Sequence, residues 1–342
     1  MHAVVLDEIG GALFYRTLPD PELGEDEVLV RVRAAGVCGR DLIDRRGGFP
    51  MMKLPIVLGH EFSGEVLQLG ARVEGFSPGD RVVGLHRPHC GVCPSCLQGE
   101  TVDCERSWQS FGHTIDGGYA ELVAANQRAL VRLPGEVSFE QGASVACTAG
   151  VALRALRHVA RLEIGERVLV TGASGGVGLC AIQIAKSMGA SVVATTGSTD
   201  KADALRRAGA DHVVVVHDGK RFDDEVRRLT DGGVGVALEL TGSATFDSAL
   251  RSLRRRGRLV LLGNIRTEKV SFNPGALILY NTSIAGSHLC SHRDLEDCFE
   301  LMRSGKLRVV VDRTLPLAQA EQAHRLLAER AVAGRVVLLP EA

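Results

Sequence analysis

A glycine-rich turn between a short apolar strand and a helical segment is the feature that most restricts the fold of this chain. Residues 167–173 (RVLVTGA) have the composition of a buried strand, and residues 177–188 carry apolar side chains at helical spacing. Further strand patterns follow at 191–197, 212–216, 236–240 and 258–263, with helical patterns near 222–229 and 245–253. This alternation predicts a doubly wound parallel sheet, an α/β fold.

The same turn has the composition of a phosphate-binding loop. Glycines permit a tight turn and a close approach of the backbone to a pyrophosphate, and the helix N-terminus adds unpaired N–H groups and a partial positive charge. An ordinary strand–helix turn can also be rich in glycine, but the position between a strand and a helix favours a dinucleotide. The candidate cofactor-binding residues are Gly172, Ser174, Gly175, Gly176 and Val177.

The end of the second strand indicates which dinucleotide binds. A site for NAD(H) usually places Asp or Glu there to accept from the ribose 2′-hydroxyl. Here Thr196 and Ser198 offer hydroxyls and Lys201 offers a cation, which suits a 2′-phosphate and favours NADP(H) over NAD(H). Asp200 leaves the alternative open: we expect it to cap the next helix, but in another register it would be the ribose acceptor of an NAD(H) site.

The chain divides by texture into three regions. Its 342 residues are too many for one compact core, and 45% of them are apolar, enough for two domains. Residues 1–140 are turn-rich with strand patterns at 28–37 and 63–70, and residues 141–275 hold the strand–helix alternation. Residues 276–342 mix helical patterns at 295–304 and 319–329 with a closing strand at 334–340. We expect the first and last regions to form one β-rich domain and the middle region to be inserted into it.

Charge and hydropathy point to a small-molecule substrate. The formal net charge is -1, so nothing suggests a nucleic-acid or membrane partner. The first residues lack the basic and apolar regions of a signal peptide, and no apolar run approaches the roughly 18 residues that span a bilayer. We therefore expect a cytoplasmic protein, and in a reducing compartment its nine cysteines are more consistent with metal sites or core thiols than with disulfides.

Four of the cysteines are clustered in a turn-rich loop. Cys90, Cys93 and Cys96 are each separated by two residues, and Cys104 follows after seven more. Four thiols at this spacing can close a tetrahedral zinc site, which leaves no vacant position for a substrate. Disulfides between cysteines this close would be strained. The spacing therefore predicts a structural zinc.

A second set of metal-ligand residues is scattered. Cys38 follows a predicted strand, His60 and Glu61 follow Gly59, and Cys147 lies far along the chain. A single cysteine is most often a small core residue, and a single histidine is more often structural than a ligand. Their spacing alone does not join them into a site.

The run Gly59-His60-Glu61-x2-Gly64-x5-Gly70-x2-Val73 resembles the zinc signature of the medium-chain dehydrogenase/reductase superfamily, zinc alcohol dehydrogenase type. The four-cysteine lobe and the glycine loop resemble those of the same family, so the resemblance spans essentially the whole chain. It implies a GroES-like β-rich catalytic domain with an inserted Rossmann domain. It also implies a homodimer or homotetramer, and a catalytic zinc held by Cys38, His60 and Cys147 that Glu61 can join or leave.

The resemblance extends the cofactor site as well. It implies that residues after the fourth and fifth Rossmann strands line the cofactor groove and that a basic residue in the closing strand meets the pyrophosphate; these residues are Thr241, Gly263, Asn264 and Arg335. A zinc with three protein ligands keeps an open position where it can polarise a carbonyl oxygen. The leading expectation is therefore hydride transfer between NADP(H) and an alcohol or carbonyl substrate.

One position departs from the alcohol dehydrogenase pattern. Such enzymes usually carry Ser or Thr two residues after the first cysteine ligand, to pass the alcohol proton toward solvent, and here that residue is Arg40. Arginine stays protonated and is a poor relay; it could instead pair with Asp41 or Asp44. The stretch at 40–47 resembles zinc-type acryloyl-CoA reductases, which implies as an alternative the NADPH-dependent reduction of an activated C=C bond. A non-catalytic NADPH-binding protein is a third hypothesis, which the complete set of zinc ligands disfavours.

Overall fold

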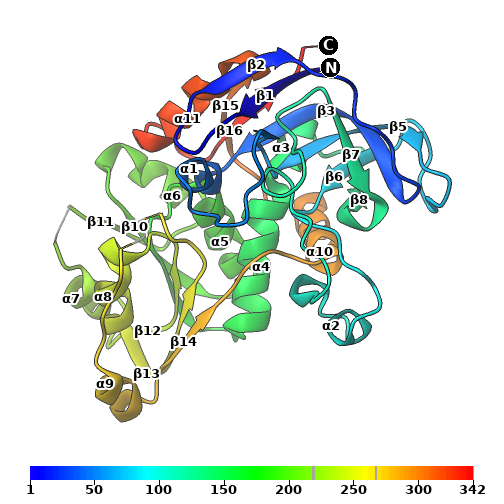
Figure 1. Ribbon diagram of the computed structural model, residues 1–342. Helices are drawn as coiled ribbons and strands as arrows, with labels where there is room; N and C mark the ends of the chain where they lie inside the picture. Colours follow the sequence, from blue (N-terminus) through cyan, green and yellow to red (C-terminus); the bar gives the residue numbers. More distant parts are fainter. Residues whose placement is uncertain (218–219, 266–267, 342) are drawn as a thin grey trace. The chain divides into compact units, whose positions relative to one another are not determined.

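The computed structural model describes residues 1–217, 220–265 and 268–341; residues 218–219, 266–267 and 342 lie outside this description. The chain forms two compact units. The first contains residues 1–147, 289–299 and 311–342, and the second contains residues 148–288 and 300–310. Figure 1 labels the elements of both. Among the described residues, no helix is both long and apolar enough to cross a membrane.

The first unit is built on antiparallel strands, as its turn-rich sequence predicts. A seven-stranded sheet has the order β15-β16-β3-β5-β6-β8, with β7 also pairing with β3, and a smaller sheet has the order β2-β1-β4. The strands are β1 (His2–Leu6), β2 (Leu13–Thr17), β3 (Glu27–Val37), β4 (Ile56–Val57), β5 (Phe62–Leu69), β6 (Arg81–Gly84), β7 (Leu122–Asn126), β8 (Leu130–Arg132), β15 (Val311–Pro316) and β16 (Arg335–Leu339). β16 pairs antiparallel with β3, so strands from the first and last regions of the chain lie side by side in this sheet.

The pairing of β3 with β5 explains a glycine of the zinc signature. Gly64 lies opposite Val32, and a Cβ at Gly64 would stand only 2.0 Å from the carbonyl oxygen of Arg31. Only glycine fits such a close approach of two backbones. Inward-facing valines of both strands pack in the buried core of this unit, together with Phe62 and Tyr119.

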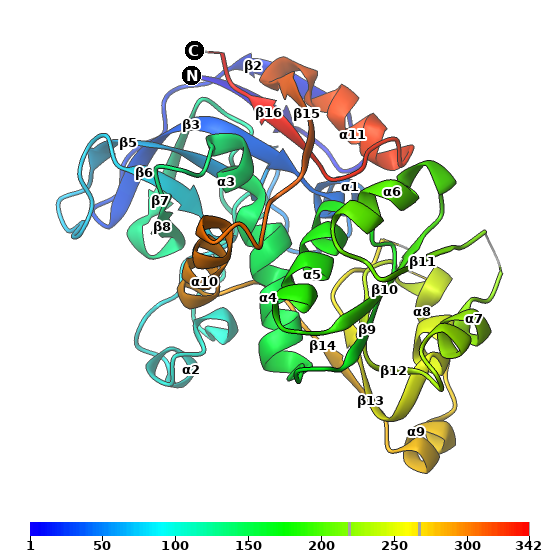
Figure 2. The same ribbon diagram turned by 180° about the vertical axis from the view of Figure 1, so that it is seen from behind.

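The second unit contains a parallel sheet with the order β11-β10-β9-β12-β13-β14, seen from behind in Figure 2. Its strands are β9 (Arg167–Val170), β10 (Ser191–Thr196), β11 (His212–Val215), β12 (Val234–Glu239), β13 (Leu253–Leu261) and β14 (Ser283–Gly286). Numbered from β9, this is the order 3-2-1-4-5-6 of a dinucleotide-binding sheet. The predicted Rossmann domain is therefore confirmed.

Helices connect these strands. In the second unit they are α4 (Val151–Arg154), α5 (Gly176–Ser187), α6 (Ala202–Arg207), α7 (Asp223–Leu229), α8 (Ser243–Arg251) and α9 (Pro274–Tyr280). Elsewhere the chain forms α1 (Gly39–Arg45), α2 (Pro94–Leu97), α3 (Phe139–Val145), α10 (His292–Arg303) and α11 (Ala320–Ala328). The sequence patterns did not predict α1 or β14, because α1 buries two aspartates and β14 has no buried residue, so no apolar pattern marks either element. β13 also begins earlier than residue 258, where the apolar run starts.

Candidate functional site

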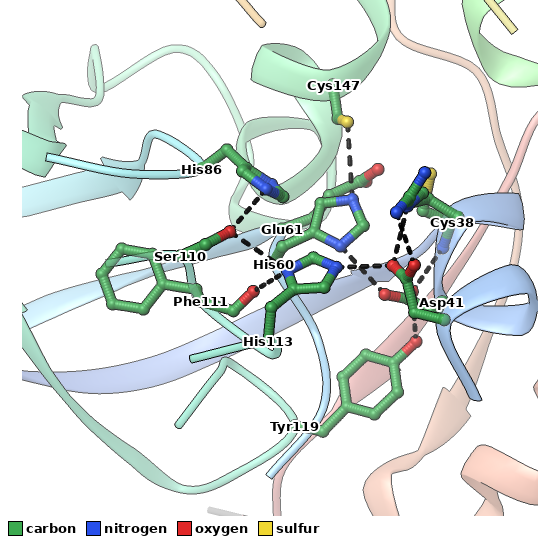
Figure 3. Close-up of polar contacts among 12 residues, drawn as sticks. Cys38, Asp41, His60, Glu61, His86, Ser110, Phe111, His113, Tyr119 and Cys147 are labelled. Atoms are coloured by element: carbon green, nitrogen blue, oxygen red, sulfur yellow. Dashed lines mark hydrogen bonds and ion pairs between the residues drawn. The ribbon is translucent and has the colours of Figure 1, made fainter. Parts of the chain in front are cut away.

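The first unit brings together the scattered metal-ligand residues. Cys38, His60, Glu61 and Cys147 each direct one ligand atom into a common space, and these four atoms lie within 4.8 Å of one another. Cys38 follows the last residue of β3, His60 and Glu61 precede β5, and Cys147 lies in a π-helical turn at Ala146–Gly150. Figure 3 shows the side chains converging from these separate segments.

The imidazole of His60 is oriented by a carboxylate. Its Nδ1 lies 2.9 Å from Oδ1 of Asp41, and its Nε2 lies 3.5 Å from the sulfur of Cys147. A histidine that binds a metal usually donates its other ring N–H to a carboxylate, which fixes the tautomer and the ring plane. The geometry therefore presents Nε2, and not Nδ1, to a metal.

Asp41 is the functional residue that sequence reasoning missed. Its Oδ2 accepts from the backbone N–H of Cys38 and from the phenol hydroxyl of Tyr119, both at 2.9 Å. Asp41 is thus bonded both to a neighbour in sequence and to His60 on another segment. The signal that could have revealed it is its position three residues after Cys38, at the start of α1, where an acidic side chain folds back on the preceding backbone.

Glu61 is neutralised by Arg335. The Nη2 of Arg335 donates to Oε1 of Glu61 at 2.8 Å and to the carbonyl oxygen of Cys147 at 3.1 Å, and it lies 3.6 Å from the sulfur of Cys38. Arg335 is only 6% exposed. Here it stands over the metal-ligand cluster, as one would expect of a cation that offsets several buried anions. Its contact with the cofactor pyrophosphate stays a prediction.

The protonation of the cluster follows from these contacts. The hydrogen bond from Cys147 and the charge of Arg335 hold the pKa of Cys38 well below its usual range, against the effect of burial. Burial disfavours the charged form of His60, but Asp41 raises the pKa of His60 well above its ordinary value. Burial raises the pKa of Glu61 to about 7, although Arg335 opposes the shift.

Two thiols, one imidazole and one carboxylate form a donor set that fits zinc. Neither Cys38 nor Cys147 is in a disulfide, so both thiols are available as ligands. Thiolate and imidazole are the ligands that zinc prefers, and a carboxylate oxygen is the usual companion. These residues can therefore hold the zinc that the family resemblance implies.

The four-cysteine loop forms a separate metal-ligand cluster in the same unit. The ligand atoms of Cys90, Cys93, Cys96 and Cys104 also lie within 4.8 Å of one another. Backbone N–H groups approach the sulfurs, from Cys93 to Cys90 at 3.3 Å and from Cys90 to Cys104 at 3.3 Å. Such bonds stabilise thiolate charge. The donor set fits a closed zinc site, as predicted from the spacing.

Arg40 forms one end of a chain of hydrogen bonds beside the first cluster. Its Nη2 lies 2.7 Å from Oδ1 of Asp44, and Nε2 of His113 lies 2.5 Å from Oδ2 of the same carboxylate. Nδ1 of His113 lies 3.1 Å from Oγ of Ser110, which is 2.7 Å from Nε2 of His86. Figure 3 shows this row from Ser110 and His113 toward His60. The ring of His86 is 4.8 Å from the ring of His60.

In the second unit the glycine loop joins β9 to α5. The amide of Gly172 donates to Oγ1 of Thr195 at 3.2 Å, and the amide of Ala173 donates to the Thr195 carbonyl at 2.8 Å, so β10 fixes the loop. Gly172 has a φ of 53°, and a Cβ at Gly178 would lie 2.4 Å from the carbonyl oxygen of Ala173. Both positions need glycine. Of the predicted loop residues, Ser174 and Gly175 lie between the strand and α5, and Gly176 and Val177 are the first residues of α5.

The other predicted cofactor residues follow neighbouring strands. A Cβ at Gly172 would lie 2.6 Å from Oγ1 of Thr241, which places Thr241 directly beside the loop. The amide of Gly263 donates to the carbonyl of Glu239 at 3.1 Å, and Asn264 is exposed next to it. The carboxyl ends of parallel strands are where a dinucleotide binds. The structure therefore gathers Thr241, Gly263 and Asn264 on the side of the sheet where the loop lies.

The end of β10 carries the residues that were expected to select the cofactor. Thr196 is buried and its hydroxyl is bonded to the backbone of Ser198, at 3.3 Å to the amide and 3.4 Å to the carbonyl. Lys201 is half-buried and Asp200 is exposed. The expectation that Asp200 caps the next helix is wrong, because α6 begins after Lys201 and has no side-chain cap. Lys201 and Asp200 occupy one short 3-10 turn.

Comparison with known proteins gives two family models and a set of full-length relatives. Residues 24–135 match the alcohol dehydrogenase GroES-like domain, and residues 176–304 match the zinc-binding dehydrogenase model. An acryloyl-coenzyme A reductase of Metallosphaera sedula is 39% identical over 339 residues, covering 99% of both chains. An alcohol dehydrogenase of Geobacillus stearothermophilus is 33% identical over 343 residues, also covering 99% of both. The crystal structure of AibC is 42% identical with a TM-score of 0.93, covering 100% of this chain and 96% of the other.

Asp41→Asn should weaken metal binding without unfolding the chain. The amide is nearly isosteric, but it removes the negative charge opposite His60 and can disrupt the bonds to Cys38 and Tyr119. Loss of such a supporting carboxylate costs about 10–100-fold in metal affinity. Zinc content would be measured after dialysis against increasing concentrations of a chelator. The variant should lose one of its two zinc ions at a lower chelator concentration than the wild type. Asp247→Asn, a change at an exposed helical pair with Arg251, is the control; equal zinc retention in both variants would contradict the prediction.

Proposed function

The chain belongs to the zinc-dependent alcohol dehydrogenase family of oxidoreductases, and we propose that it uses NADPH to reduce a C=C bond conjugated to a carbonyl group. The observation that carries this proposal is Arg40, which stands where alcohol dehydrogenases usually have a hydroxyl. The name of the 39% identical relative, an acryloyl-coenzyme A reductase, supports it. Reduction of an alkene thus replaces the alcohol or carbonyl reaction as the leading hypothesis.

Arg40 is held in place by the structure and is not free to act as a relay. Its guanidinium pairs with Asp44, which is 1% exposed and also bonded to His113. The same guanidinium lies 5.8 Å from the centre of the Phe49 ring. With a side-chain exposure of 43%, Arg40 still presents a fixed positive charge to solvent. That charge suits an anionic substrate better than a small neutral alcohol.

In the proposed reaction, zinc would act as the Lewis acid and NADPH as the hydride donor. Zinc on Cys38, His60 and Cys147 would polarise the carbonyl group that activates the double bond, and NADPH would supply a hydride to the β-carbon. The chain's own residues must then hold the substrate and provide the proton that the α-carbon needs. Arg335 would compensate the charges of Glu61 and of the Cys38 thiolate, which it contacts at 2.8 Å and 3.6 Å.

The hydrogen-bonded row beside the cluster can deliver that proton. A proton on Asp44 can pass to Nε2 of His113. The proton on Nδ1 of His113, which also lies 2.9 Å from the carbonyl oxygen of Phe111, can then pass to the hydroxyl of Ser110. The hydroxyl proton of Ser110 can pass in turn to Nε2 of His86, whose ring lies 4.8 Å from that of His60. Each atom is within hydrogen-bond distance of the next. A hydroxyl between two imidazoles can accept and donate at the same time. Ser110 can therefore relay a proton between the two imidazoles without becoming charged itself.

The second candidate is reduction of a ketone or aldehyde. The zinc ligand set and the 33% identical alcohol dehydrogenase support it. The same row would serve a carbonyl reduction, because that reaction also consumes one proton. A homo-oligomer, without nucleic-acid or membrane partners, is part of our proposal for both candidates. Complete inactivity would leave the third hypothesis, a non-catalytic NADPH-binding protein.

A substrate panel tests the proposed function directly. Oxidation of NADPH by the zinc-loaded enzyme would be followed at one pH with acryloyl and crotonyl thioesters, ketones, aldehydes and, in the reverse direction, alcohols. We expect turnover with the enoyl thioesters and at least about a hundredfold lower kcat/KM with the others, a difference of roughly 3 kcal/mol. Turnover confined to alcohols and ketones would reject the alkene proposal.

Ser110→Ala should lower kcat and leave KM for the substrate little changed. The change breaks the row between His113 and His86 while keeping its surroundings, and loss of a proton-transfer group costs about a hundredfold or more. The solvent deuterium isotope effect on kcat should rise because proton delivery becomes limiting. Ser110→Thr, which keeps the hydroxyl, should restore most of the rate. Equal kcat values in the Ala and wild-type enzymes would exclude the row from the reaction.

Lys201→Ala should raise KM for NADPH about tenfold and change KM for NADH little, because only NADPH carries a 2′-phosphate for the ammonium group to meet. Steady-state rates with each cofactor measure this. Asp200→Ala is the matched variant in the same turn. If Asp200→Ala raises KM for NADH while Lys201→Ala leaves KM for NADPH unchanged, the cofactor is NAD(H).

A further inference from the structure

A groove in the first unit lies outside the metal-ligand cluster. Its volume is about 740 Å³, within the range of small-molecule sites. Residues from the segments before β5, around the four-cysteine loop and after β7 line it; those used below are Met51, Lys53, Arg106, Trp108 and Arg128. The groove borders the four-cysteine cluster, because Cys90 is one of its lining residues, but it contains none of the residues of the Cys38, His60, Glu61 and Cys147 cluster.

The groove is positively charged. It contains the cations of Lys53, Arg106 and Arg128, and its one acidic residue, Asp26, is paired with Arg72 at 2.9 Å. Within residues 1–217, 220–265 and 268–341, no ion pair involves Lys53 or Arg106. Arg128 is oriented by a hydrogen bond from its Nη1 to the carbonyl of Cys90. Lys53 and Arg106 have no ion-pair partner among the described residues, and together with Arg128 they place three cations on one concave surface beside Cys90. Cations that converge in this way favour a ligand with several phosphates.

The groove also offers an aromatic platform. Trp108, the only tryptophan of the chain, is 69% exposed and lines the groove together with Met51, which is 51% exposed. The Trp108 carbonyl accepts from the hydroxyl of Thr114 at 2.9 Å, which fixes the backbone that carries the indole. An exposed aromatic ring beside cations is the arrangement on which a nucleotide base stacks.

The groove is joined to the wall of the metal-ligand cluster. The amide of Lys53 donates to the carbonyl of His113 at 2.8 Å, and Thr114, the next residue, lines the groove. The imidazole of His113 faces Asp44, and its ring lies 5.8 Å from the ring of His60. The turn that contains His113 and Thr114 thus lies between the groove and the hydrogen-bonded row. A long substrate could have its reactive end at the cluster and its charged end in the groove.

We propose that this groove binds the 3′-phosphoadenosine diphosphate end of a coenzyme A thioester, with Lys53, Arg106 and Arg128 at the phosphates and Trp108 against the adenine. The proposal rests on the proposed function and names its substrate class more closely. The combination of several phosphates, a purine and a long flexible arm matches the three features of the groove: its cations, its aromatic ring and its connection to the wall of the cluster. A free adenine nucleotide has the first two but not the arm.

The test measures binding separately from turnover. Zinc-loaded enzyme saturated with NADP⁺, so that the glycine loop is occupied, would be titrated calorimetrically with coenzyme A and with adenosine 3′,5′-bisphosphate. Lys53→Ala and Arg106→Ala should each raise Kd for both about tenfold, the equivalent of one charge-assisted hydrogen bond. Trp108→Ala should do the same, and Trp108→Phe should recover most of the affinity. Arg31→Ala, an exposed arginine of β3 outside the groove, should have no effect.

Kinetics provide the second readout. The ratio of kcat/KM for an enoyl coenzyme A ester to that for the matching pantetheine ester should be large in the wild type, and it should fall about tenfold in Lys53→Ala and Arg106→Ala. Unchanged Kd and an unchanged ratio in these variants would overturn the groove proposal. Turnover of both esters at the same kcat/KM would overturn it too, although the proposed function would stand. Groove-dependent binding of coenzyme A without any enoyl turnover would instead reject the proposed function and keep the groove.

Discussion

The reactive end of the first unit depends on the buried carboxylate of Asp41. One group accepts from the backbone of Cys38, accepts from the hydroxyl of Tyr119 and faces Nδ1 of His60. A carboxylate that is 3% exposed is stable only if such partners replace water. Because His60 and Asp41 come from different segments, their pairing also fixes how α1 sits against the chain before β5. The candidate metal ligands are thus positioned by a residue that is not one of them.

The same cluster has to balance its charge without solvent. Two thiols and Glu61 are enclosed, and the buried guanidinium of Arg335 is the cation that the closing strand places among them. A buried ion pair of this kind is costly to break, since removing one partner leaves the other charge uncompensated. The antiparallel pairing of β16 with β3 is what delivers Arg335 there. The last strand of the chain therefore contributes to the chemistry of a site whose first ligand is at residue 38.

Arg40 begins a row of polar contacts beside the metal-ligand cluster. An arginine needs a carboxylate, and Asp44 one helical turn later supplies it. That carboxylate also binds His113, so the hydrogen bonds continue through Ser110 to His86. His113 belongs to this row, and its carbonyl accepts from the amide of Lys53, which lines the groove that contains Trp108. Charge, proton delivery and recognition of a long substrate can therefore arise from one contiguous part of the first unit.

Most of the local structure could be predicted from the sequence. The period of the apolar residues fixed β3, β5, the parallel strands from β9 to β13 and helix α5 to within a few residues, because strands and helices bury one face and repeat accordingly. The sequence analysis missed α1 and β14, since the buried residues of α1 are aspartates and β14 has no buried side chain to mark it. The four-cysteine cluster was also visible, because its ligands lie within fifteen residues and a loop that short keeps them together.

Only the tertiary structure brings together the candidate metal ligands that lie far apart in the sequence. Cys38, His60 and Cys147 are isolated in the sequence, and only the pairing of β3 with β5 and the turn after α3 bring their ligand atoms within 4.8 Å. The spacing could show that Asp41 folds back on Cys38, but not that it faces His60, and it could not place Arg335 beside Glu61. Both of these contacts join segments that are distant in the sequence. By itself the sequence determined the strands with a clear apolar pattern, the glycine loop and the four-cysteine cluster, which rest on local geometry. The assembled reactive cluster exists only through contacts between distant segments.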